Sequence, residues 1–295
     1  MVLAAGLGTR LRPLTELVPK PLVPVGDRSV LGHVAAELER GGASRLVANT
    51  HHRAERFDET ALRELALPCQ LVHEPEILGT AGGVANARDA LGEGDVILWN
   101  GDILADLDVA ALLAAHRRRQ PLATLAVCAR PRASGTLGLG DQDHIVRLRG
   151  ERYGEEQRAV DFVGIQVISA ALRERLPPAG CLVGDAYQPA LRRGEPIAVA
   201  EVVRSWSDIG NLCAYHDANL AWLEQRGLDR WVASDARVGP DVVLTQCVVG
   251  PRAQVVGAGE LRGVVVWPDA VVEAPLTNAV APFAGPPVRI GEPGL

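Results

Sequence analysis

The first 130 residues alternate short apolar runs with longer amphipathic stretches, and this alternation restricts the chain to few folds. Strand-like runs occupy residues 2–5, 45–50, 70–73, 96–100 and 122–128. Helical periodicity occupies residues 30–40, 54–65, 80–91 and 108–116, with Ser29, Thr80 and Asp108 as candidate N-terminal caps. Strands that alternate with helices form βα units around a mostly parallel sheet. The sequence therefore predicts an α/β domain.

Residues 135–168 change to short strands with turns, which in an α/β fold often form a lobe over the carboxyl edge of the sheet. Ligands of such folds tend to bind at that edge. A further strand over residues 197–203 and a helix over residues 211–225 complete a predicted domain of residues 1–230.

Residues 231–295 are rich in Val, Gly, Pro and Asp and lose the helical periodicity. Short units recur as Val238-Gly239-Pro240, Val249-Gly250-Pro251 and Val266-Trp267-Pro268, at intervals of 11 and 17 residues. These intervals approximate multiples of six, which favours a short parallel, left-handed β-helix. A small irregular β tail is the alternative. A β-helix of this kind commonly mediates self-association, so a homo-oligomer formed through the tail is one expectation.

Composition excludes several classes of function. The net charge is -6 and the chain has no large basic cluster, which argues against nucleic acid as a partner. No run of eighteen apolar residues is free of charge, Gly or Pro, so we expect no membrane-spanning helix. The five cysteines stand more than thirty residues apart, which excludes a Cys-x-x-Cys metal site and fits a reducing, cytoplasmic location.

A glycine-rich segment with basic residues follows the first predicted strand. Gly6 and Gly8 allow backbone N–H groups to approach a phosphate, and Arg10 supplies a planar cation for its charge. Lys20, inside Pro-Lys-Pro, offers a second cation. The segment is neither a dinucleotide fingerprint, because Leu11 stands where a third glycine is needed, nor a Walker loop, because no Gly-Lys-Ser/Thr follows.

Two aspartates follow predicted strands and could meet a ligand there. Asp102 ends Asn100-Gly101-Asp102, just past the strand over residues 96–100, and Asp208 lies in Trp206-Ser207-Asp208. A hard divalent cation that bridges nucleotide phosphates needs one or two such carboxylates. A turn residue and a helix cap are the structural alternatives for these two positions.

The run from Leu3 to Pro21 resembles the signature of the sugar-1-phosphate nucleotidylyltransferases. The similarity extends to about Glu224 and includes Leu78-Gly79-Thr80-Ala81-Gly82-Gly83 and Phe162-Val163-Gly164-Ile165. The resemblance implies a Rossmann-like three-layer domain that transfers a nucleotidyl group from a nucleoside triphosphate to a sugar 1-phosphate and releases pyrophosphate.

The same resemblance implies the roles of individual residues. Arg10 would hold the leaving phosphates, Lys20 would balance charge between the reacting phosphates, and Asp102 and Asp208 would hold Mg²⁺. The nucleotide-binding set would be Leu3, Ala5, Gly6, Gly8, Thr9, Arg10, Glu74, Gly79, Thr80 and Gly83. The sugar-phosphate set would be Lys20, Asn100, Gly101 and Gly164.

The base and the sugar stay open. Glu74 lies near where relatives place a base-contacting group, and a carboxylate suits the two adjacent donors of guanine, which favours GTP. A solvated carboxylate at the strand end is the alternative for Glu74. The sequence thus leans to a guanylyltransferase acting on a mannose-type sugar. Residues 147–158 lack the Glu-Lys-Pro of many relatives, in which the chain resembles the uridylyltransferase-like branch. A uridylyl- or thymidylyltransferase acting on another sugar 1-phosphate is therefore the alternative. A non-catalytic protein that binds a sugar nucleotide is a further alternative, disfavoured because all four catalytic residues are present.

Overall fold

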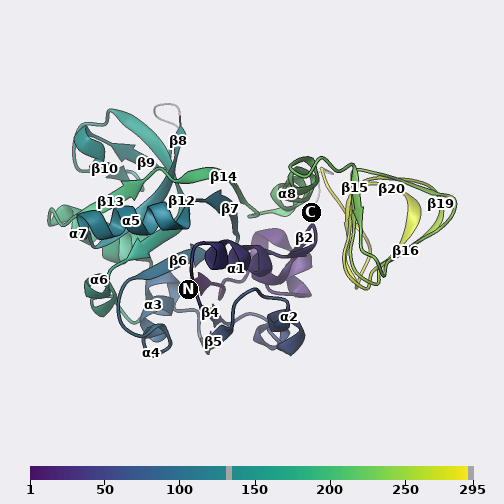
Figure 1. Cartoon of the computed structure of the whole chain (residues 1–295), viewed down its shortest axis with the longest axis horizontal. Coiled ribbons are helices and arrows are strands. Elements are labelled where there is room, and N and C mark those ends of the chain that lie inside the picture. Colours follow the sequence, from purple (N-terminus) through teal and green to yellow (C-terminus); the bar gives the residue numbers. More distant parts are fainter. Residues whose placement is uncertain (131–134, 292–295) are drawn as a thin grey trace. The chain divides into compact units, whose positions relative to one another are not determined.

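The apolar runs form strands, and their order in the sheet brings distant parts of the sequence together (Figure 1). The computed structural model describes residues 1–130 and 135–291, so the last four residues of the predicted tail lie outside it. Two compact units are described separately. Met1–Leu7 and Leu31–Trp206 make up the sheet unit, and Gly8–Val30 and Ser207–Leu295 make up the tail unit. The predicted domain boundary at residue 230 stays a prediction.

The sheet unit is built on a mixed sheet. Its strands are β1 Val2–Leu3, β4 Leu46–Thr50, β5 Cys69–His73, β6 Val96–Asn100, β8 Ala123–Arg130, β9 Leu137–Leu139, β10 Ile145–Leu148, β11 Glu151–Arg152, β12 Arg158–Ile168 and β13 Ile197–Ala200. β1 lies in parallel between β4 and β6, and β5 extends this parallel part beyond β4. β12 runs antiparallel to β6 and β8, and β7 (Ile103–Leu107) pairs with β14 (Val203–Asp208). The predicted α/β class is confirmed, whereas the sheet expected to be mostly parallel is mixed, because β12 and the short strands β9 to β11 of the predicted lobe pair antiparallel.

Helices join these strands. They are α1 Val30–Arg40, α2 Glu59–Arg63, α3 Gly79–Asn86, α4 Arg88–Leu91, α5 Val109–Arg119, α6 Ala170–Glu174, a π-helix Leu182–Tyr187 and α7 Gln188–Arg192. Single 3₁₀ turns lie at Thr9–Leu11, Leu14–Glu16, Lys20–Leu22, Ala54–Arg56 and Asp141–Asp143. α1 has the predicted bounds, and Asp108 caps α5 by accepting a hydrogen bond from the Ala111 N–H.

Three predictions about helices were wrong in detail. The helix expected over residues 80–91 is two helices, α3 and α4, because Ala87 between them has non-helical backbone, with φ of -87° and ψ of 8°. The helix expected over residues 54–65 is interrupted, because Phe57 is buried and Asp58 caps a new helix by accepting from the Ala61 N–H at 2.9 Å. Thr80 is not a cap, since α3 already begins at Gly79. The Thr80 hydroxyl instead accepts a hydrogen bond from the Leu182 N–H at 2.8 Å, which ties α3 to the π-helix.

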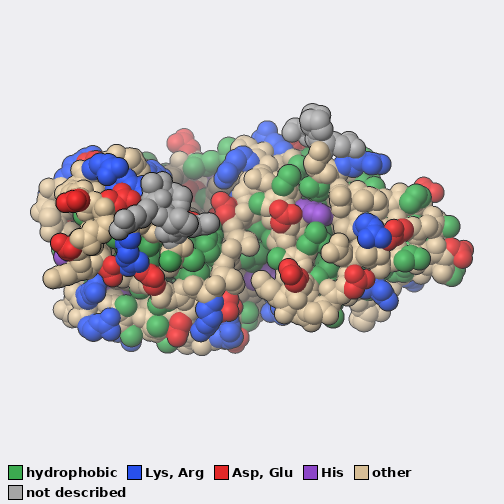
Figure 2. All heavy atoms as spheres, turned by 90° about the horizontal axis from the view of Figure 1, so that it is seen from above, with side chains coloured by type: hydrophobic (Ala, Val, Ile, Leu, Met, Phe, Trp, Pro, Cys, Tyr) green, Lys and Arg blue, Asp and Glu red, His purple; other side chains and the backbone are tan. Residues whose placement is uncertain are grey.

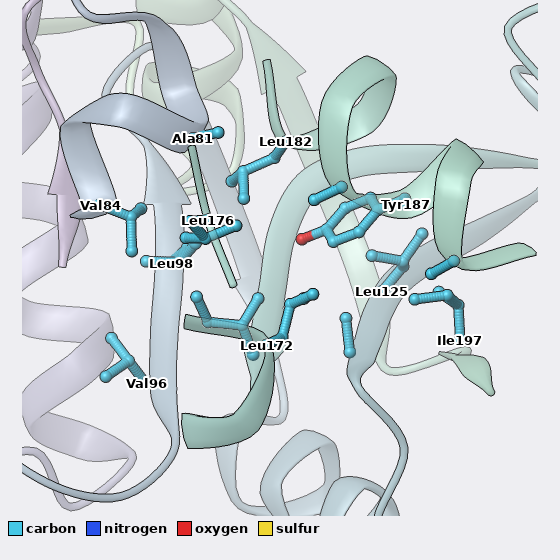
Figure 3. Close-up of a cluster of buried hydrophobic side chains, with 14 of the residues drawn as sticks. Ala81, Val84, Val96, Leu98, Leu125, Leu172, Leu176, Leu182, Tyr187 and Ile197 are labelled. Carbon is cyan, nitrogen blue, oxygen red and sulfur yellow. The ribbon is translucent and has the colours of Figure 1, made fainter. Parts of the chain in front are cut away.

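The core of the sheet unit holds α3 in place (Figure 3). Ala81 and Val84 of α3 are buried, with Leu98 of β6, Leu176 and Leu182 in the same apolar cluster. Burying each such aliphatic side chain contributes roughly 1.5–3 kcal/mol. The segment that begins at Gly79 is therefore a fixed part of the unit rather than a loose loop.

The tail unit contains parallel strands and one long helix. They are the hairpin β2 Pro24–Val25 and β3 Arg28–Ser29, α8 Leu212–Glu224, β15 Arg230–Val232, β16 Arg237–Val238, β17 Val242–Thr245, β18 Cys247–Val249, β19 Gln254–Val266, β20 Val271–Ala281 and β21 Val288–Arg289. Parallel pairs join residues 17 apart, as in Arg230 with Cys247 and Gln254 with Val271, until the offset falls to 15 at Leu261 with Leu276. β21 pairs antiparallel with β20. The strands therefore stack as successive turns of the chain (Figure 1).

Helix α8 joins the β2–β3 hairpin to the stacked strands within the tail unit. Tyr215 donates to the Pro24 carbonyl at 2.5 Å, and the Asn219 amide oxygen accepts from the Gly26 N–H at 3.0 Å. The Trp267 indole N–H donates to the Tyr215 hydroxyl at 2.8 Å. The hairpin and the tail therefore share one hydrogen-bonded network, most of which is buried.

The surface of the molecule carries side chains of both charges. On the face in Figure 2, basic and acidic side chains are interspersed rather than gathered by sign. Within residues 1–130 and 135–291, no helix is both long and apolar enough to cross a membrane.

We expect Gly26→Ala to destabilise the protein far more than Gly227→Ala. Both glycines have left-handed backbone, with φ of 60° and 64°, which costs a residue with a Cβ about 1 kcal/mol. A Cβ on Gly26 would also lie 2.1 Å from the Trp222 ring, whereas one on Gly227 meets nothing within 4 Å. Overpacking adds roughly 1–3 kcal/mol, so urea denaturation should separate the variants. Equal losses of unfolding free energy would contradict the packing of α8 on the hairpin.

Candidate active site

Four parallel strands of the sheet unit end at one edge, and the predicted ligand-binding residues follow them. β6 ends at Asn100, β1 at Leu3, β4 at Thr50 and β5 at His73. Leu3 is in register with Asn100 on one side and with Asn49 on the other. Backbone and side chains that leave the carboxyl ends of neighbouring strands converge on one ligand site in folds of this type.

The Asn100-Gly101-Asp102 turn lies beside β1 and β12. The Gly101 N–H donates to the Leu3 carbonyl at 2.9 Å, which continues the pairing of β6 with β1. Gly164 of β12 has φ of 77°, and a Cβ there would lie 2.6 Å from the Asn100 amide nitrogen. The fold therefore brings together Asn100, Gly101 and Gly164. Asp102, the last residue of the turn, is half-buried.

The backbone that follows β1 has open space at Gly6. Ala5 is buried, whereas Gly6 is exposed and a Cβ there would meet nothing within 4 Å. Gly79 is also exposed, with φ of 75°, and a Cβ on it would lie 2.4 Å from the Gly180 carbonyl oxygen. Glycine is thus required at 79 by both conformation and close approach.

Glu74 follows β5 but does not present its carboxylate to solvent. It is 0% exposed, and one carboxylate oxygen accepts from the Asn49 side-chain amide at 2.7 Å. The other accepts from the Leu78 N–H at 3.1 Å. Direct contact of Glu74 with a base stays a prediction, and its oxygens already have protein donors.

The basic residues of the predicted site belong to the tail unit. Gly8 has φ of 63°, its carbonyl accepts from the Leu11 N–H and the Thr15 hydroxyl at 2.9 Å each, and Thr9 and Arg10 are exposed in the 3₁₀ turn that follows. Lys20 is 8% exposed, and a Cβ added to Gly8 would lie 3.4 Å from the Cβ of Lys20.

Lys20 also stands out in the composition. It is the one lysine among the 30 basic residues Lys and Arg of the sequence. An ammonium is a compact point charge, whereas a guanidinium is a planar fork, so the two are not interchangeable at a buried position.

Arg10 and Asp208 lie close together inside the tail unit. Asp208 ends β14 and is exposed, and the buried Gly210 follows it. A Cβ on Gly210 would lie 3.0 Å from an Asp208 carboxylate oxygen and 3.2 Å from an Arg10 guanidinium nitrogen. The absence of a side chain at 210 leaves room for both groups.

The structure thus gathers the predicted residues in two groups. The sheet unit carries Leu3, Ala5, Gly6, Glu74, Gly79, Thr80, Gly83, Asn100, Gly101, Asp102 and Gly164. The tail unit carries Gly8, Thr9, Arg10, Lys20 and Asp208. Sequence reasoning missed Asn49, whose amide oxygen accepts from the Ala4 N–H at 2.8 Å. The one signal was an amide that follows the apolar residues Leu46 to Ala48 of the strand.

A divalent cation would find carboxylate donors at two positions. Asp102 and Asp208 carry the hard oxygen ligands that Mg²⁺ prefers, and neither is fully buried. Outside residues 131–134 and 292–295, no group of three or more His, Cys, Asp and Glu side chains could hold a metal ion. A site of one or two carboxylates completed by nucleotide oxygens and water needs no such group.

Comparison with known proteins places this chain among relatives with described functions. A model of the family described as nucleotidyl transferase matches residues 1–148. Mannose-1-phosphate guanylyltransferase of Mycobacterium tuberculosis is 28% identical over 295 residues, which covers 93% of this chain and 81% of that protein. N-acetylmuramate alpha-1-phosphate uridylyltransferase of Neisseria meningitidis serogroup B is 35% identical over 114 residues, or 38% of this chain and 49% of that protein.

A solved structure supports the fold. HddC from Yersinia pseudotuberculosis superposes with a TM-score of 0.62 at 21% identity, over 75% of this chain and 97% of that one. The resemblance inferred from the motifs is confirmed by the family model, which spans half of the sequence. This chain belongs to the nucleotidyl transferase family.

Proposed function

We propose that this protein is an enzyme that transfers a nucleotidyl group from a nucleoside triphosphate to a sugar 1-phosphate, forming an NDP-sugar and pyrophosphate. The observation that carries the proposal is the carboxyl edge of the sheet. There the glycine-rich segment leaves β1 between Asn100-Gly101-Asp102 on one side and Asn49 on the other. Backbone N–H groups and a carboxylate at such an edge suit a nucleotide and its phosphates.

The reaction needs no nucleophilic side chain. A phosphate oxygen of the sugar 1-phosphate attacks the α-phosphorus in line, a new P–O bond forms, and the bond to the β-phosphate breaks to release pyrophosphate. The protein contributes positioning and charge neutralisation. The exposed guanidinium of Arg10 would hold the departing phosphates, and the ammonium of Lys20 would balance charge between the two reacting phosphates.

The remaining site residues follow from the same assignment. Leu3, Ala5, Gly6, Gly8, Thr9, Gly79, Thr80 and Gly83 would line the nucleotide, with Glu74 behind them, and Asn100, Gly101 and Gly164 would line the sugar phosphate. Asp102 and Asp208 would hold Mg²⁺, which when bound supplies positive charge against the triphosphate.

For the substrates we propose GTP and a mannose-type sugar 1-phosphate. The similarity to the mycobacterial guanylyltransferase extends over most of this chain, whereas the uridylyltransferase matches a shorter part. A panel of GTP, UTP, dTTP, ATP and CTP with several sugar 1-phosphates, followed by pyrophosphate release, tests both choices. Preference for UTP with another sugar would favour the uridylyltransferase alternative, and binding without turnover would favour the non-catalytic one.

For the tail we propose a short parallel, left-handed β-helix over residues 231–295 that follows a catalytic domain over residues 1–230. Parallel pairing at an offset of 17 residues, which falls to 15 from the pair Leu261–Leu276 onward, supports this architecture. Self-association through the tail and a cytoplasmic location belong to the same proposal, and sedimentation of the purified protein tests the former.

Asp102→Asn and Asp208→Asn should each lower kcat by roughly a hundredfold or more, because each removes a negative charge from the metal-binding pair. Both variants should keep the wild-type melting temperature, since neither carboxylate is part of the core. Asp217→Asn, at a position 77% exposed on α8, is the matched control and should keep full activity. Near wild-type pyrophosphate release by either site variant would remove it from the metal site.

Lys20→Ala should lower kcat/KM by roughly a hundredfold, the size expected for a charge-assisted contact to a transition state. Lys20→Met keeps the buried stem and separates loss of charge from loss of packing. Lys20→Arg should also be impaired, because a planar fork replaces a compact ammonium at a position 8% exposed. An unchanged kcat/KM in folded Lys20→Met would assign Lys20 a structural role.

A further inference from the structure

A buried amide–carboxylate pair lies behind the carboxyl edge of the sheet, and no step of the proposed reaction uses it. Asn49 of β4 is 2% exposed and Glu74, directly after β5, is 0% exposed. The Asn49 amide nitrogen donates to a Glu74 carboxylate oxygen at 2.7 Å. Both residues belong to the sheet unit, so the pair is internal to one compact body.

The outer ends of the pair hold two backbone segments. The Ala4 N–H, where the chain leaves β1, donates to the Asn49 amide oxygen at 2.8 Å. The Leu78 N–H, directly before α3, donates to the second Glu74 oxygen at 3.1 Å. An unbroken chain of three hydrogen bonds therefore connects the start of the glycine-rich segment with the start of the Gly79–Gly83 segment.

Directionality makes this chain specific for these two side chains. The Ala4 N–H is a donor, so the oxygen of the Asn49 amide must face it and the nitrogen must face Glu74. Glu74 then receives donors at both ends, from Asn49 and from the Leu78 N–H. A carboxylate accepts at both oxygens, whereas an amide accepts at one end only.

Helix α3 lies directly against the pair. A Cβ on Gly83 would be 2.7 Å from the Asn49 amide nitrogen and 2.7 Å from the Glu74 carboxylate oxygen. Glycine at 83 therefore lets α3 approach the two polar groups at a distance that any other residue would prevent. The close packing of α3 on Asn49 and Glu74 therefore depends on glycine at position 83.

Stability alone gives little reason for such a pair. Replacing buried charged or polar partners with apolar side chains of similar volume is often neutral or stabilising. Apolar side chains cannot, however, accept hydrogen bonds from the Ala4 and Leu78 N–H groups and so cannot hold both segments at fixed points.

We propose that Asn49 and Glu74 are positioning residues that set the spacing between the segment beginning at Ala4 and the segment Leu78–Gly83, and so set the affinity for the nucleoside triphosphate. The inference rests on the proposed function in one respect: these two segments bind the nucleotide. This role takes the place of the predicted direct contact between Glu74 and the base, because both side chains are buried and act through the backbone.

A double variant that exchanges the amide and the carboxylate tests the proposal. Glu74→Gln leaves an amide end facing a donor, and Asn49→Asp places two carboxylates against each other. Each should raise the Kd for a non-hydrolysable nucleoside triphosphate roughly tenfold or more, the size of one lost hydrogen bond to a charged group.

Combining the two substitutions restores every donor–acceptor pair. The carboxylate now at position 49 accepts from the Ala4 N–H and from the new amide at position 74, whose oxygen accepts from the Leu78 N–H. The double variant should bind within about threefold of wild type.

Controls separate positioning from stability. Thr124→Val removes another buried hydrogen bond of the sheet unit, the 2.9 Å contact between Thr124 and His116. It should lower the melting temperature without changing the nucleotide Kd. The KM for the sugar 1-phosphate should change less than about threefold in every variant. Glu74→Asp, which keeps the charge but shortens its reach, replaces Glu74→Gln if that variant does not fold.

The outcomes are distinct. A raised Kd in the single variants with recovery in the double variant supports the proposal. A wild-type Kd in a folded single variant, or a double variant no better than the singles, overturns it. Wild-type protein that binds the triphosphate but forms no NDP-sugar refutes the proposed function while the Kd values still decide the role of the pair. Wild-type protein that binds no triphosphate overturns both.

Discussion

The constraint on which the sheet unit depends is the pairing of β1, a strand of two residues, between β4 and β6. So short a strand can be central only if its backbone groups find partners beyond its ends. The Gly101 N–H completes the pairing on the β6 side, and the Asn49 side chain accepts the Ala4 N–H on the β4 side. The polar groups that form hydrogen bonds with the backbone of β1 and Ala4 thus also lie at the carboxyl edge of the sheet. The same contacts therefore hold the central strand and position the residues at that edge.

The tail unit depends on a comparable arrangement around α8. Tyr215 accepts a hydrogen bond from Trp267 of the tail and donates one to Pro24 of the hairpin, while Trp222 covers Gly26. Aromatic side chains with a polar tip can fill a core and still satisfy backbone groups. The segment that carries Arg10 and Lys20 is consequently part of the same compact body as the C-terminal strands, although more than two hundred positions separate them in the sequence.

Hydrophobic periodicity predicted most of the helices and strands, because their apolar faces are long enough to give a pattern in the local sequence. Helix α1, strands β4 to β6 and helix α8 lie within a residue or two of the predicted bounds. The misses are short elements. The π-helix Leu182–Tyr187 and strand β7 have no periodic signal, and the break at Phe57 depends on burial of one ring. Thr80 looked like a cap, but its hydroxyl is used by Leu182, 102 positions away.

The sequence by itself determined the family, because the glycine-rich and basic motifs lie within residues 1–148, which the family model matches. It also determined the α/β class, since the alternation of strands and helices is a local property. Tertiary structure alone decided what Asn49 and Glu74 do. Their partners, the N–H groups of Ala4 and Leu78, include one 45 positions distant, and hydrogen bonds between distant segments exist only once the strands are side by side.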